Sequence, residues 1–151
     1  MTRSDVKFLV IRVANMDNID AIDELDKCIA EQGVVWFGKY GRGVSATQLG
    51  AFNGTEKKYA ILVYKGKPGR SHSYSYHWYE IKAFSRKVPP SGSYPQYYKP
   101  FLNRINTWLK LSQTEMNMPG INDLYTKSSL SPVTESLSRS MSAHFFCILR
   151  H

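Results

Sequence analysis

The stretch Lys7-Phe-Leu-Val-Ile-Arg-Val13 decides the fold, because a β-branched and largely apolar run of this length predicts a buried strand. After a polar break, apolar residues recur at helical spacing as far as residue 32: Ile19, Ile22, Leu25 and Ile29. Gly33 is placed to end this helix with a positive φ. Val34-Val-Trp-Phe37 then predicts a second strand, so the chain opens as strand, helix, strand.

The rest of the chain predicts a hairpin, two helices and a last strand. Lys58-Tyr-Ala-Ile-Leu-Val-Tyr64 is the clearest strand, and residues 74–84 read as its return strand. Pro100 is expected to begin a helix with Trp108 on its apolar side and Lys110 off that side. Residues 131–142 are expected to form another helix. Residues 144–149 close the chain as an apolar strand. The order predicts one mixed α+β domain over residues 1–151.

Charge and aromatic rings are concentrated in the middle of the chain. The 151 residues carry 20 Lys+Arg and 12 Asp+Glu, a formal net charge of +8. Residues 1–32 have a net charge of −3, whereas residues 39–110 hold thirteen bases and two acids. Sixteen of the twenty aromatic residues lie between Trp36 and Trp108. Because cations bind phosphates and flat rings stack on bases, this pattern favours nucleic-acid binding.

Several other classes of protein do not fit the sequence. No apolar run approaches the roughly 18 residues that cross a bilayer, and residues 1–7 lack a signal-peptide core, so we expect a cytoplasmic protein without a membrane partner. Cys28 and Cys147 are too few for a disulfide framework. The four histidines have no zinc-ligand spacing, and no cofactor motif is present, so we expect neither a metal nor a cofactor.

Candidate binding residues follow from this pattern. Trp36 ends a short strand beside the glycine-rich residues 38–43, and Trp78 lies in the return strand beside Tyr76. We expect Trp36 to stack on a base, with Trp78 or Tyr76 as a second wall of an aromatic pocket. Basic residues of the neighbouring loops are the expected phosphate contacts: Lys39, Arg42, Lys65, Lys67 and Arg70.

Residues 7–84 resemble the opening of PUA-like domains of the EVE and YTH kind. The shared pattern is the strand Phe8-Leu-Val-Ile-Arg-Val13, the helix of residues 18–32 and Gly33-Val-Val-Trp36, followed by the hairpin. The resemblance implies a partly closed mixed β barrel flanked by helices. In these families the Trp after the first helix belongs to an aromatic cage that holds a methylated or otherwise modified base, and that role passes here to Trp36.

The function expected from the sequence is therefore a nucleic-acid-binding domain that reads a base, modified or unmodified, from RNA or DNA. Such a reader also has a separately encoded effector protein as a possible partner. One alternative is a small metal-independent nuclease or nucleic-acid-modifying effector that uses His77 with Glu80 or Tyr79 for proton transfer. Another is a protein-interaction module with a Tyr-rich surface.

Overall fold

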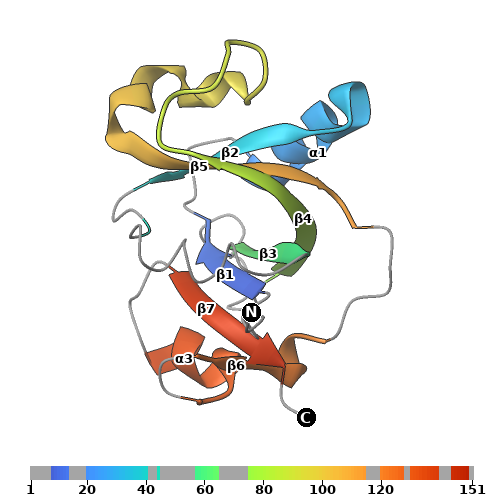
Figure 1. The fold of residues 1–151 in the computed structure, drawn as a ribbon, viewed down its shortest axis with the longest axis vertical. Coiled ribbons are helices and arrows are strands. Elements are labelled where there is room, and N and C mark those ends of the chain that lie inside the picture. Colours follow the sequence, from blue (N-terminus) through green and yellow to red (C-terminus); the bar gives the residue numbers. More distant parts are fainter. Residues whose placement is uncertain are drawn as a thin grey trace, which may run out of the picture.

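Seven strands form one mixed sheet in a computed structural model, which describes residues 8–13, 20–40, 44, 57–64, 75–114, 120–127, 130–139 and 144–149. The strand order is β2-β5-β4-β3-β1-β7-β6, and every neighbouring pair is antiparallel except β1 and β3 (Figure 1). The strands are β1 (Phe8–Arg12), β2 (Val35–Tyr40), β3 (Lys58–Tyr64), β4 (Ser75–Ser85), β5 (Ile105–Gln113), β6 (Leu124–Thr126) and β7 (His144–Leu149). The helices are α1 (Ala21–Gln32), η1 (Gln96–Arg104), η2 (Ile121–Asp123) and α3 (Val133–Arg139), η1 and η2 being 3-10 helices.

Helix α1 has a capping residue at each end, which explains why it begins and ends where the sequence predicts. The Asp20 carboxylate accepts hydrogen bonds from the backbone N–H groups of Ile22 and Asp23, both at 3.1 Å. At the other end Gly33 has a φ of 83° and donates its N–H to the Ile29 carbonyl at 2.7 Å. Only glycine adopts that φ without strain, so the expected stop at Gly33 is confirmed.

The sheet curls around one apolar core. Side chains from the inner face of β1 to β5 pack with α1 in a single cluster, and Phe146 and Ile148 of β7 pack against the same cluster. Since β2 and β7 lie far apart in the strand order but share this inner core, the sheet must bend strongly, as the sweep of β4 in Figure 1 shows. Among the described strands, β2 and β6 are unpaired edges, so the barrel is not closed there.

The outer face of the sheet carries two separate clusters. At the β2–β5 end, η1 covers a group of mostly aromatic side chains that we call the ring cluster. It consists of Tyr94, Tyr98, Ile105 and Trp108, with Trp36, Tyr97 and Leu102 packed against them. At the other end, α3 covers β1, β3 and β7, and we call that group the α3 cluster. Trp78, Tyr76 and Tyr59 pack against the α3 cluster. The outer face of β4 and β5 lies between the two.

The expectation of a helix from Pro100 to residue 110 is wrong for its second half. Residues up to Arg104 form η1, but Ile105–Gln113 is the strand β5. Trp108 faces the ring cluster, whereas Leu109 and Leu111 face the inner core. A strand that is buried on both faces carries apolar side chains on both of them. Its apolar residues then also occur at helical spacing, so the sequence resembles that of an amphipathic helix.

The other predicted elements are present with small shifts of their ends. β3 and β4 form the expected antiparallel hairpin, and the last helix and last strand appear as α3 and β7. β2 extends to Tyr40, so Gly38 and Lys39 belong to a strand and not to the glycine-rich loop expected there. The structure is thus a mixed α+β arrangement with a curled sheet flanked by helices.

Candidate nucleic-acid interface

Trp36 stands at the border of the ring cluster. The Trp108 ring is fully buried and lies 5.3 Å from the Tyr94 ring and 5.5 Å from the Tyr98 ring, the latter edge to face. Trp36 is half-buried against these rings, and its backbone N–H donates to the Ser93 carbonyl at 2.9 Å. The indole of Trp36 is therefore held on one side by packing and keeps part of its surface exposed.

Lys110 lies directly over this indole. Trp36 and Lys110 are opposite each other in the β2–β5 register, and the Lys110 Nζ is 6.0 Å from the Trp36 ring centroid. This is the outer limit of a cation–π contact. A cation and a partly exposed aromatic ring thus lie next to each other, and proteins that bind single strands combine these two kinds of group.

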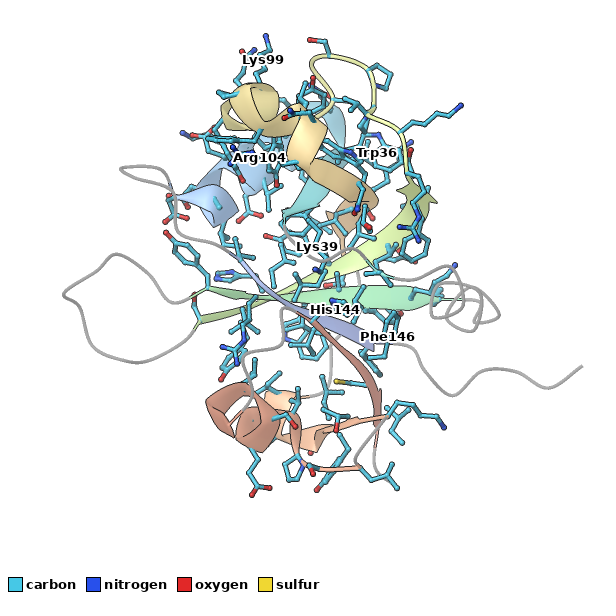
Figure 2. The ribbon with its side chains drawn as sticks, turned by 90° about the vertical axis from the view of Figure 1, so that its left-hand side faces the viewer. Trp36, Lys39, Lys99, Arg104, His144 and Phe146 are labelled. Carbon is cyan, nitrogen blue, oxygen red and sulfur yellow. The ribbon has the colours of Figure 1, made fainter. Side chains whose placement is uncertain are left out.

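The chain around this pair is basic. Residues 81–113 hold six bases and no acid. These bases are Lys82, Arg86, Lys87, Lys99, Arg104 and Lys110. Figure 2 shows Lys99 of η1 above Trp36 and Arg104 of η1 at about the level of Trp36, and both side chains are exposed. An anionic chain that approached Trp36 would meet positive charge from Lys110 of β5 and from the two exposed bases of η1.

Gly38 allows β2 to lie close against β5. A Cβ atom at Gly38 would come within 2.9 Å of the Ile105 Cδ1 atom and within 3.0 Å of the Trp108 ring. Real Cβ atoms do not sit this near to other heavy atoms, so the packing of the ring cluster requires glycine here. The atoms that a Cβ would meet belong to the side chains of Ile105 and Trp108, so these side chains lie against the β2 backbone at Gly38.

Trp78 and Tyr76 lie elsewhere on the same outer face. Trp36 is opposite Lys110 on β5, and Trp78 precedes Tyr79, which is opposite Gln113. The two indoles are thus separated by two strand spacings and about four residues, or about 17 Å. A base sandwich needs two rings roughly 7 Å apart, so the structure does not bring Trp78 or Tyr76 beside Trp36 as the wall of one pocket.

Lys39, an expected phosphate contact, is buried. It lies on the inner face of β2, like Phe37, and only 2% of its surface is exposed. Figure 2 shows it in the middle of the molecule, between Trp36 above and His144 and Phe146 below. Burial lowers the pKa of its ammonium. Because the strand continues through Lys39, its side chain points inward and does not reach a phosphate on the outer face.

The remaining expected phosphate contacts, Arg42, Lys65, Lys67 and Arg70, lie outside the described residues. Their placement therefore neither adds to nor subtracts from the basic surface around Trp36.

The groups expected for proton transfer do not converge. His77 and Glu80 point to opposite faces of β4, and the His77 Nε2 is 2.9 Å from the Ser75 hydroxyl. The Tyr79 hydroxyl donates to the Asp26 carboxylate at 2.8 Å, and burial and this hydrogen bond raise the pKa of Tyr79. In the part of the chain that the structure describes, no three His, Cys, Asp or Glu side chains gather as metal ligands.

The two cysteines are not activated nucleophiles. Burial, followed by the charges of Glu31 and Glu24, raises the pKa of the Cys28 thiol. Burial raises that of Cys147 to about 12. A reactive cysteine needs a lowered pKa, so both thiols are packing groups.

Comparison with known proteins adds no relative. No protein-family model matches the chain, no curated protein matches it, and no solved structure matches its fold. Within the described residues, no helix is long and apolar enough to cross a membrane.

The structure adds residues to the interface that the sequence did not single out. Lys110 was expected on the polar side of a helix, but β5 places it over Trp36. Tyr94 and Tyr97 come from the segment between β4 and η1 and from η1 itself. The signal available in the sequence was the density of aromatic residues before Trp108.

Proposed function

We propose that this domain binds nucleic acid through the outer face of its β2–β5 end, with Trp36 stacking on a base. The observation that carries the proposal is the half-buried Trp36 indole with Lys110 over it. Lys110 belongs to residues 81–113, which hold six bases and no acid. Stacking on an aromatic side chain contributes about 1–3 kcal/mol per base, and each phosphate contact adds an electrostatic contribution that depends on salt.

The resemblance of residues 7–84 to PUA-like domains is a second argument for the same proposal. It implies that the Trp after the first helix contacts the base, and the residue at that position is Trp36. In this proposal Tyr94 and Tyr97 of the ring cluster support the indole in place of Trp78. A preference for a methylated base is the finer part of the proposal.

Fluorescence titration with short single-stranded RNA and DNA, unmodified and base-methylated, at two salt concentrations tests the proposal. We expect binding that weakens with salt and that loses about tenfold or more in affinity with Trp36→Ala. Trp36→Phe is the matched variant, since it keeps a ring and should retain most of the binding. Affinity that is equal at both salt concentrations, or unchanged in Trp36→Ala, would contradict the proposal.

A further inference from the structure

The second tryptophan of the outer face needs a role of its own. Trp78 is half-buried, meets the Phe8 ring edge to face at 6.1 Å, and packs beside Tyr76 and Tyr59. Trp78 lies on the same face as Trp36, as the strand registers show. Trp36 is opposite Lys110, and Lys110 and Ser112 share a face of β5. Ser112 is opposite Glu80, which lies two residues after Trp78 and therefore on the same face of β4. The face between the two indoles belongs to β5 and β4 and carries Lys110 and Glu80, which are half-buried, and Ser112, which is buried.

We propose that Trp36 and Trp78 are two separate stacking positions on one track for single-stranded nucleic acid. The separation of about 17 Å is too large for one base but corresponds to about five nucleotides, since successive nucleotides of a stacked strand rise about 3.4 Å. That length lies at the short end of the site sizes of domains that bind single strands along a sheet, which are about 4–16 nucleotides. The inference rests on the proposed function and adds to it the class of ligand and its minimum length.

The charges along the track fit an anionic occupant. Lys110 stands beside Trp36. Among the described residues, the carboxylate between the two indoles is that of Glu80, and it is paired with the Lys82 ammonium at 2.9 Å. The pair removes most of the repulsion that Glu80 alone would exert on a phosphate. Lys82 is half-exposed, so its ammonium can also contact a phosphate of the strand.

Duplex nucleic acid fits this arrangement less well. Stacking on two indoles requires unpaired bases whose faces are accessible, and in a duplex those faces are covered by the neighbouring pairs. The occupant to which the track commits is therefore a single strand.

The test is a length series of labelled oligo-dT and oligo-U of two, four, six and eight nucleotides, measured by fluorescence anisotropy. For the unaltered protein we expect affinity to rise at least about tenfold between two and six nucleotides and then to level off. For the six-nucleotide ligand, Trp36→Leu and Trp78→Leu should each weaken binding at least about fivefold. Leucine keeps an apolar side chain against Phe8 while removing the ring, and Trp78→Phe should restore most of the affinity.

The outcomes separate the inference from the function on which it rests. A plateau already at two nucleotides, with binding that depends on Trp36 but not on Trp78, would overturn the two-position track and leave the proposed function standing. No binding at any length would overturn the proposed function itself. The length series needs no substitution, so the inference stays testable even if a Trp78 variant fails to fold.

Discussion

Trp36 and Trp78 occupy the same outer face of one sheet, yet their surroundings differ. Trp36 packs against rings from η1 and β5 and has Lys110 above it, and Lys110 belongs to the acid-free residues 81–113. Trp78 packs against the α3 cluster beside a Glu80–Lys82 ion pair. The two indoles thus share one face and a similar degree of burial, and they differ in the charge beside them, which is a lone ammonium at Trp36 and an ion pair at Trp78.

The ring cluster should be the more sensitive of the two regions to loss of a ring. Trp108 is fully buried, so Trp108→Ala leaves a large cavity between η1 and β5 and should lower the free energy of unfolding by about 3–5 kcal/mol. Trp78→Ala removes a half-buried ring and should lower it less. Urea unfolding of both variants measures the difference. An equal or larger loss for Trp78→Ala would show that the α3 cluster is the tighter one.

Gly38 tests whether close packing of β2 positions Trp36. Gly38→Ala places a methyl group 2.9 Å from Ile105 and 3.0 Å from Trp108, and such overpacking should lower the free energy of unfolding by about 1–3 kcal/mol. Gly120→Ala is the matched control, because its Cβ would meet only the Asp123 carboxylate at an ordinary 3.5 Å. Thermal unfolding and Trp fluorescence of both variants check this. A neutral Gly38→Ala would mean that β2 has room to move away from β5.

Elements that depend on residues close in the chain were predictable from the sequence, whereas features that depend on distant strands were not. Helix α1 and its stop at Gly33 follow from local capping, and the β3–β4 hairpin follows from two runs close in the chain. The strand β5 was predicted as a helix because it is buried on both faces. The burial of Lys39 was not predicted because β2 continues past Gly38, where the sequence indicated a loop. The sequence singled out Trp36 and Trp78, but only the strand order gives the two strand spacings between them.

Lys110 should contribute more to binding than to stability. Its side chain is half-buried over the Trp36 ring, so Lys110→Gln should change the unfolding free energy by only about 0.5–1 kcal/mol. If the ammonium contacts a phosphate, the slope of log affinity against log salt should become shallower by about one. Lys127→Gln, an exposed lysine in the turn after β6 and far along the strand order from Trp36, is the control and should leave the slope unchanged. A slope that is the same in Lys110→Gln and the unaltered protein would place the phosphates elsewhere.

Lys39 should show the smallest effect, on the pH dependence of stability. Because burial lowers the pKa of Lys39 in the folded protein, the unfolded chain holds this proton to higher pH. Between the lowered pKa and the ordinary value near about 10.4, the unfolded state binds more protons, so stability must rise with pH. Below that window the cost of burying the ammonium is fully present. The unfolding free energy of the unaltered protein, compared with that of Lys39→Met, should therefore increase as pH rises from neutral to about 10. Lys99→Met, at an exposed lysine of η1, should give a difference that does not change with pH. A difference for Lys39→Met that falls with pH would show that the inner core stabilises the charged ammonium, and a flat difference would show that burial does not lower the pKa of Lys39.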